Sequence, residues 1–291
     1  MFKNILLPIY EGRPAACVVP YALALAENHQ ASLTFLTVLE NSASAEEESK
    51  AEDFLKNTTE TVFRDTKGEY PISWSIERGE LEKTVAKYVT EHQCDLVCLA
   101  SSVTKGLLQR ITGNHSERIL RAVSCPVLVA DHEVEKPWGL KFSHLLIPID
   151  YVQDNNNAIE LGKEMASKLG LSITLFTMVY QINNTNNTDI IGLATPVDDF
   201  INKANFDEAH EHLDKVATQI EALGIPTSAK TVIGNDSANE IVKAIAENSC
   251  DLTIMTTRES TPAKAFFMGS NVSKIISMNC LPILMIKQNR V

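Results

Sequence analysis

The chain contains one stretch of sequence twice, and the two copies decide the fold: FKNILLPIY at residues 2–10 and FSHLLIPID at residues 142–150. A shift of 140 residues superposes 2–39 on 142–179 without a gap. Near the end of each half a second block repeats with a shift of 156, so that Cys94-Asp95-Leu96 falls on Cys250-Asp251-Leu252. Because both blocks recur in the same order, the sequence predicts a tandem duplication.

Each half alternates short apolar runs with longer amphipathic stretches, which are typical of buried strands and surface helices. Strands are predicted over residues 5–9, 33–39, 72–76, 96–100 and 127–130, and over 145–149, 173–179, 227–232, 252–256 and 283–286. In the first half, helices are predicted over residues 15–27, 45–64, 81–91 and 116–122. This alternation predicts parallel strands joined by right-handed crossovers. We therefore expect an α/β fold of two tandem doubly wound domains, each a five-stranded parallel sheet of order 3-2-1-4-5 with helices on both faces.

The repeats also predict where the domains lie. We expect the first domain over residues 1–131 and the second over 142–291, with a linker near 132–140 that contains charged residues, proline and glycine. The second half is longer by 156 − 140 = 16 residues, most of them in 181–189 and the loop that follows. The last strand of each half should be a sheet edge, so edge-to-edge pairing would join the halves within one chain. A homodimer is a further expectation.

Composition excludes several classes of function. The 291 residues include 37 acidic and 26 basic side chains, a net charge of −11. This balance argues against a general nucleic-acid binder and against adsorption to an anionic membrane. No apolar segment approaches the roughly 20 residues of a membrane helix, and the run at 5–9 is too brief for a secretory signal. Six scattered cysteines indicate reduced thiols, so we expect a cytoplasmic protein.

The order of these landmarks resembles the universal stress protein family in its tandem form. The resemblance rests on the two first strands, the fourth strands that follow Cys94 and Cys250, Gly113 and Gly269 before the last helix, and the closing strands after Pro126 and Pro282. It covers nearly the whole chain. It implies a non-catalytic stress-response factor that binds a small ligand. In nucleotide-binding members, an Asp after the first strand holds the adenine or ribose side, and Gly-x₂-Gly-x₉-Gly-(Ser/Thr) cradles phosphates.

This sequence departs from that pattern unequally in its two halves. In the first half Tyr10 takes the place of the Asp, Ala100 and Val103 stand where the two glycines belong, and Asn114 follows Gly113. A β-branched valine crowds a phosphate, so we expect no nucleotide there. The second half keeps part of the pocket. The predicted cofactor-binding residues, for ATP or AMP, are Asp150, Thr256, Arg258, Gly269, Ser270 and Asn271.

Alternatives remain open for these residues. Thr256 and Glu259 replace the two glycines, and the Glu259 carboxylate would repel a triphosphate unless Arg258 and Lys264 compensate. Asp150 and Ser270 could equally serve as helix caps. The apolar segment 190–197 indicates packing on the other half, on a second chain or on an oily ligand. The alternative functions are therefore an interaction scaffold with degenerate pockets and a weak ATPase.

Other polar residues are expected to be structural. Asp95 and Asp251 recur at the same place and are interpreted as strand-entry residues. His210 and His212 lie two apart in a predicted helix and point to different sides, so we expect a solvated helix face and no shared metal. We expect no catalytic residue and no enzymatic activity.

Overall fold

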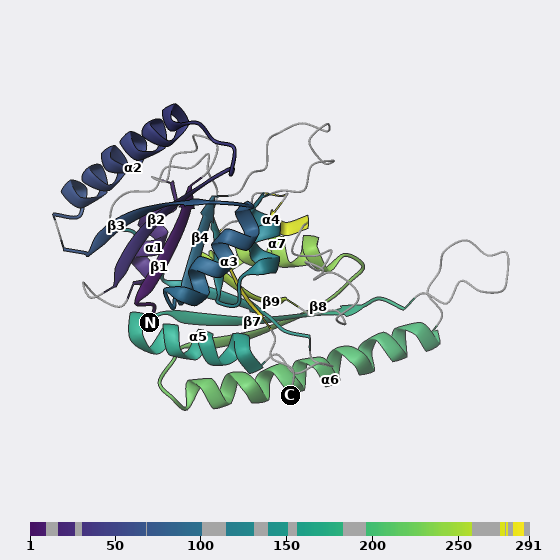
Figure 1. The fold of residues 1–291 in the computed structure, drawn as a ribbon. Coiled ribbons are helices and arrows are strands. Elements are labelled where there is room, and N and C mark those ends of the chain that lie inside the picture. Colours follow the sequence, from purple (N-terminus) through teal and green to yellow (C-terminus); the bar gives the residue numbers. More distant parts are fainter. Residues whose placement is uncertain are drawn as a thin grey trace, which may run out of the picture. The chain divides into compact units, whose positions relative to one another are not determined.

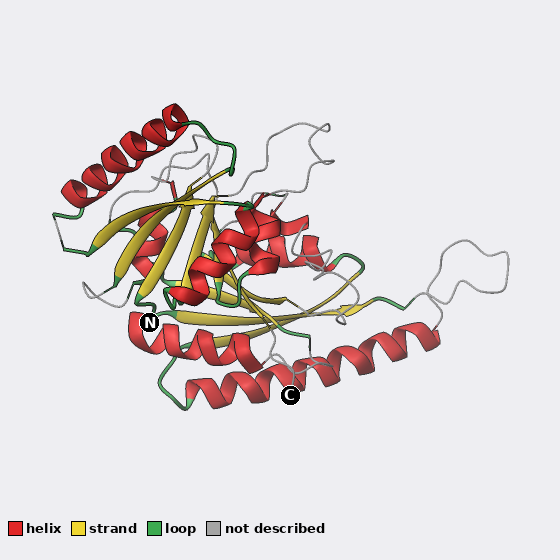
Figure 2. Cartoon of the chain, in the orientation of Figure 1, coloured by secondary structure: helices red, strands yellow, loops and turns green. Residues whose placement is uncertain are grey.

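The computed structural model describes residues 1–9, 17–26, 31–67, 69–100, 115–130, 139–150, 156–182, 196–257, 274–276, 278 and 282–287. The strands are β1 Asn4–Ile9, β2 Ser32–Leu39, β3 Ile72–Arg78, β4 Leu96–Ala100, β5 Val127–Ala130, β6 His144–Pro148, β7 Ser172–Tyr180, β8 Thr227–Gly234, β9 Leu252–Thr257 and β10 Ile283–Lys287. The helices are α1 Val19–Leu25, α2 Ala45–Asp65, α3 Leu81–Glu91, α4 His115–Ala122, α5 Asn156–Leu169, α6 Pro196–Glu221 and α7 Ser237–Glu247. Figure 1 traces these elements along the chain, and Figure 2 shows strands and helices by colour.

The chain divides into two compact units. Unit 1 comprises Met1–Phe142 with Thr256–Val291, and unit 2 comprises Ser143–Met255. The sheet of unit 1 has the order β3-β2-β1-β4-β5-β10, and that of unit 2 the order β9-β6-β7-β8. All pairs within these two orders are parallel except the pair of β5 and β10, which is antiparallel. The α/β doubly wound architecture predicted from the sequence is therefore confirmed, with the first half in the order 3-2-1-4-5.

The edge pairing expected between the last strands of the two halves is present within unit 1. Ile283 lies opposite Val129, and Met285 lies opposite Val127. All four residues of β5 are buried, as are residues 283–286 of β10. The Lys287 ammonium, at the end of β10, donates a hydrogen bond to the carbonyl of Arg121 at 3.3 Å. A basic side chain there suits the negative end of α4.

Helices cover opposite faces of the sheet in unit 2. The imidazole of His210, in α6, lies 3.3 Å from the hydroxyl of Thr231 in β8. The preceding residue in β8, Lys230, forms an ion pair with Glu247 of α7. Because alternate residues of a strand point to opposite faces, α6 and α7 cover different faces of β8. In Figure 1, α6 runs alongside β8, against which it packs.

One glycine is required where α5 packs on this sheet. A Cβ atom added at Gly162 would lie 2.4 Å from Cδ1 of Ile147 in β6 and 3.7 Å from Cδ1 of Ile254 in β9. The absent side chain therefore lets α5 approach β6 and β9 closely.

The helix limits mostly follow the sequence predictions. Pro20 lies in the first turn of α1, where proline is tolerated. One difference concerns the apolar segment 190–197, which we expected to be a loop. Instead, Pro196 begins α6. Proline is favoured in the first helical turn, because an N–H group there has no acceptor within the helix. Residues 190–195 lie outside the described residues.

Candidate functional site

Each half of the chain has one topological switch point. β1 pairs with β2 on one side and with β4 on the other, and β6 pairs in the same way with β7 and β9. Successive connections thus lead away from the central strand in opposite directions. In open α/β sheets, ligands bind beyond the carboxyl ends of the strands at such points. The candidate sites therefore lie after β1 and after β6.

The backbone that precedes Asp150 is fixed at the carboxyl end of β6. The N–H of Ile149 donates to the carbonyl of Phe176 in β7, at 2.7 Å. The Thr177 hydroxyl, also in β7, donates to the carbonyl of Ile149 at 2.8 Å. Thr177 is only 2% exposed, so this hydrogen bond is shielded from water. The two bonds hold the peptide groups directly before Asp150, whose side chain is half-buried.

Two of the six predicted cofactor-binding residues lie in the described residues. Asp150 belongs to unit 2, and Thr256, the penultimate residue of β9, belongs to unit 1. Four others lie outside the described residues: Arg258, Gly269, Ser270 and Asn271. In the first half, Ala100 ends β4, and the remaining positions of the degenerate pocket also lie outside them: Tyr10, Val103, Gly113 and Asn114. The assembly of the six residues into one site stays a prediction.

The recurring aspartates occupy the opposite, amino-terminal edge of the strands. The Asp95 carboxylate accepts hydrogen bonds from the N–H groups of Lys3 at 2.8 Å and Asn4 at 2.9 Å. In unit 2, Asp251 accepts hydrogen bonds from three donors: the Ser143 N–H at 2.8 Å, the Ser143 hydroxyl at 2.6 Å and the His144 N–H at 3.1 Å. Each aspartate also donates its own N–H to the strand it faces, Asp95 to Asn4 and Asp251 to His144. Each carboxylate thus fixes the fourth strand of its half against the first.

Both aspartates are therefore strand-entry residues, as their recurrence predicted. They set the register of the two strands that flank each switch point, at the end remote from the candidate site. Sequence reasoning found their position but not their partners, which are mostly backbone groups that no residue type identifies.

A hydroxyl pair recurs between the second and third strands of each half. Thr34 lies 3.0 Å from Ser73 in unit 1, and Thr174 lies 3.0 Å from Ser228 in unit 2. Thr174 is buried and also lies 2.8 Å from Nε2 of His144. The 140-residue shift superposes the two threonines, but sequence reasoning gave them no role. They join neighbouring strands through paired hydroxyl groups.

Among the thiols of the described residues, Cys17 and Cys98 are buried, and Cys94, Cys125 and Cys250 are half-buried. Cys17, Cys94, Cys98, Cys125 and Cys250 are all free thiols. Burial, reinforced by the neighbouring aspartate, raises the pKa of Cys94 and of Cys250 to about 11. Burial and the nearby Cys94 raise the pKa of Cys125 to about 12. A thiol with so high a pKa is a poor nucleophile at neutral pH.

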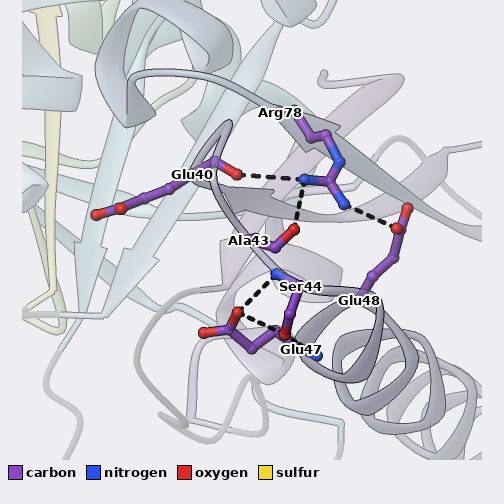
Figure 3. Close-up of polar contacts among 6 residues, drawn as sticks. All are labelled: Glu40, Ala43, Ser44, Glu47, Glu48 and Arg78. Carbon is purple, nitrogen blue, oxygen red and sulfur yellow. Dashed lines mark hydrogen bonds and ion pairs between the residues drawn. The ribbon is translucent and has the colours of Figure 1, made fainter.

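At the carboxyl end of β3, Arg78 organises the loop that enters α2 (Figure 3). Its guanidinium donates to the carbonyls of Glu40 at 3.4 Å and Ala43 at 3.0 Å, and to the Glu48 carboxylate at 2.8 Å. The next residue in that loop, Ser44, forms a capping box with Glu47, in which the Ser44 hydroxyl accepts from the Glu47 N–H at 3.2 Å. The acidic first turn of α2 suits the positive end of the helix dipole.

The histidine pair lies in α6, as expected. His212 is exposed, whereas His210 is half-buried between Thr231 and the carboxylate of Asp214, 3.5 Å away. The described residues contain no group of three or more His, Cys, Asp or Glu side chains that could hold a metal ion. In the same part of the chain, no helix combines the length and apolar character needed to cross a bilayer.

The fold is similar to those of several proteins of known structure. The chain aligns with a universal stress protein from Archaeoglobus fulgidus DSM 4304 at 14% identity and a TM-score of 0.69, covering 98% of this chain and 96% of that one. A functionally unknown protein from Pseudomonas aeruginosa PAO1 aligns at 13% identity and a TM-score of 0.65, covering 98% and 92%. At these identities the likeness shows the fold alone.

One further structure is a universal stress protein in complex with cAMP. It aligns at 12% identity and a TM-score of 0.33 over 51% of this chain and 98% of that one, too low a score to carry an argument. No curated protein matches the sequence. The model of the universal stress protein family matches residues 1–131 and again residues 141–287. The chain therefore belongs to the universal stress protein family, in a form with two copies of the family's domain.

Proposed function

We propose that this protein is a non-catalytic cytoplasmic stress-response factor that binds an adenine nucleotide, ATP or AMP, in its second half. The observation that carries the proposal is the backbone anchor before Asp150. Thr177 and Phe176 hold both peptide groups of Ile149 at a topological switch point. A carboxylate so placed can accept hydrogen bonds without first ordering the chain around it.

The residue types suit the two ends of an adenine nucleotide. The Asp150 carboxylate only accepts hydrogen bonds, so it suits ribose hydroxyls or the adenine amino group. The Thr256 hydroxyl can both donate and accept. Towards the phosphates, Arg258 supplies positive charge, and Gly269, Ser270 and Asn271 supply backbone and side-chain donors at the start of a predicted helix. Such binding would act by favouring one conformation of the protein, without a chemical step.

A nucleotide-release experiment tests the proposal. Protein purified without added nucleotide is denatured, and the released small molecules are identified by absorbance and mass spectrometry. We expect the wild-type chain to release adenine nucleotide and Asp150→Ala to release none. The matched control is Asp207→Ala, which removes an exposed carboxylate from α6 of the same unit. Retention of nucleotide by Asp150→Ala would place the ligand elsewhere.

A thermal-shift measurement provides a second readout and assigns the half. ATP at about 100 times its dissociation constant should stabilise the protein by about 2.7 kcal/mol. Tyr10→Ala, at the corresponding place in the first half, should retain this stabilisation, and Asp150→Ala should lose it. Loss with Tyr10→Ala alone would assign the nucleotide to the first half.

An interaction scaffold is the second candidate function. Five large apolar side chains among the described residues of unit 2 are exposed: Phe200 at 74%, Leu223 at 63%, Tyr180 at 62%, Ile233 at 42% and Leu169 at 36%. Exposed apolar side chains of this size favour contact with another macromolecule. A chain that releases no nucleotide but assembles as its concentration rises would support this candidate.

A further inference from the structure

β8 is the outermost strand of unit 2. It pairs with β7 over eight positions, from Thr227 opposite Ile173 to Gly234 opposite Tyr180. In the order β9-β6-β7-β8, no strand of the described residues lies on the other side of β8. This edge is independent of the candidate nucleotide site.

The hydrogen bonds to β7 show which peptide groups of β8 point outward. Ile173 and Gln181 donate their N–H groups to the carbonyls of Pro226 and Gly234. In a parallel ladder the peptide groups of alternate residues face the same neighbour, so the residues of even number in β8 face β7. The N–H and C=O groups of the odd-numbered residues then face outward: Thr227, Ala229, Thr231 and Ile233. Such a row is a template for another strand.

Edge strands usually carry charges or proline that prevent this pairing, and β8 has little such protection. It contains no proline, and its one ionisable side chain, Lys230, forms an ion pair with Glu247 of α7. By contrast β3, the outermost strand of unit 1, ends on the consecutive charges Glu77 and Arg78. The exposed side chain of Ile233 adds apolar area to the β8 edge.

We propose that β8 pairs antiparallel with β8 of a second copy of this chain, about a two-fold axis at Thr231. With this axis, Thr231 lies opposite Thr231 of the second copy, and Ala229 lies opposite Ile233 of the second copy. The peptide groups of all three residues point outward from β8. Lys230 then lies opposite Val232 of the second copy. An axis at Lys230 would also pair outward groups, but it would set two ammonium groups opposite each other, which is destabilising. Among the registers that pair outward groups, we propose the Thr231 axis because it avoids that repulsion and brings the exposed Ile233 into the pairing.

The dimer is expected to be concentration-dependent. The register forms about six main-chain hydrogen bonds over a short edge, which is a small interface. We expect a dissociation constant on the order of 10 μM. Sedimentation velocity of the full chain from about 1 to about 200 μM should show monomer converting to dimer.

Thr231→Pro is the decisive variant. Proline removes the central N–H, which the pairing with β7 does not use, and proline is tolerated at such edge positions. Both copies carry the substitution, so the dimer loses two main-chain hydrogen bonds. We therefore expect dimerisation to weaken at least about ten-fold. Ile76→Pro is the matched control, since Ile76 of β3 pairs with Thr37 of β2 as Thr231 of β8 pairs with Thr177 of β7. Ile76→Pro should leave the dimer intact.

A second variant and a second measurement test the proposal even if the Thr231→Pro variant does not fold. Ile233→Glu places a carboxylate at the exposed edge and should also abolish the dimer. In the wild-type chain, amide exchange of Ala229, Thr231 and Ile233 should slow as concentration rises, whereas that of Ser228 and Val232 should be slow throughout. A monomer up to 200 μM, or a dimer that survives both Thr231→Pro and Ile233→Glu, overturns the proposal.

Discussion

Removing the Asp251 carboxylate should loosen the pairing of β6 and β9 from its amino-terminal end. Asp251→Ala deletes three hydrogen bonds, to the N–H and hydroxyl of Ser143 and to the N–H of His144. A hydrogen bond to a charged group contributes about 1.5–3 kcal/mol, but the three are not additive and the site is partly open to water. We expect the free energy of unfolding of unit 2 to fall by about 2–4 kcal/mol.

Urea unfolding followed by circular dichroism measures this loss. With a slope of about 2 kcal/mol per molar, the urea midpoint should fall by about 1–2 M. Asp251→Asn keeps one acceptor oxygen and should lose about half as much. Asp95→Ala removes two hydrogen bonds in unit 1, to Lys3 and Asn4, and should cost somewhat less than Asp251→Ala.

Two results would refute this reasoning. A loss below about 0.5 kcal/mol for Asp251→Ala would mean that water replaces the carboxylate without cost. An equal loss for Asp251→Asn and Asp251→Ala would mean that the acceptor oxygens are not what stabilises the strand pair. Amide exchange at Ser143 and His144 should accelerate in both variants, which locates the effect.

Three further predictions follow from contacts in the interior. Thr177→Val should cost about 1–2 kcal/mol, since it leaves the buried carbonyl of Ile149 without its donor, and it should weaken ATP binding in a thermal-shift assay if Asp150 is the ligand residue. Gly162→Ala should destabilise unit 2 by about 1–3 kcal/mol in urea unfolding, and Ile147→Val, which removes the Cδ1 atom in the way, should restore part of the loss. The Cys250 thiol should react at pH 8 about 100-fold more slowly in the native chain than in urea. Because its folded pKa is raised, to about 11, the stability it contributes is full below the unfolded pKa near 9 and is lost as pH rises towards 11, a loss that Cys250→Ser should reduce.

The fold could be predicted from the sequence because strands buried on both faces are nearly continuous apolar runs. The predicted strand at 96–100 has the same bounds as β4, and the helix at 81–91 has those of α3. The start of α6 was placed wrongly, since the apolar composition of Pro196 and Val197 indicated packing but not conformation. Proline marks a helix start only when the helix that follows is recognised.

The candidate site was less accessible to prediction, for a physical reason. Asp150 is proposed from the resemblance to nucleotide-binding members of the family, in which an Asp follows the first strand, and its role stays a prediction. Thr177 could not be found in this way, because a buried threonine in a strand is also an ordinary β-branched residue, and its partner is the backbone carbonyl of Ile149. The 140-residue shift superposes Thr177 on Thr37, but a residue that recurs in both halves can have a purely structural role.

The two edges of the duplicated sheets differ in what they preserve. At the amino-terminal edge both halves keep the same device: Asp95 and Asp251 bind the N–H groups that begin β1 and β6. Each half needs this device to fix its own strand register, so neither can lose it without a cost in stability. In the sequence after the first strand, Tyr10 stands in the first half where Asp150 stands in the second. The two halves thus share the aspartate that pairs the first and fourth strands and differ at the position where a ligand residue is predicted.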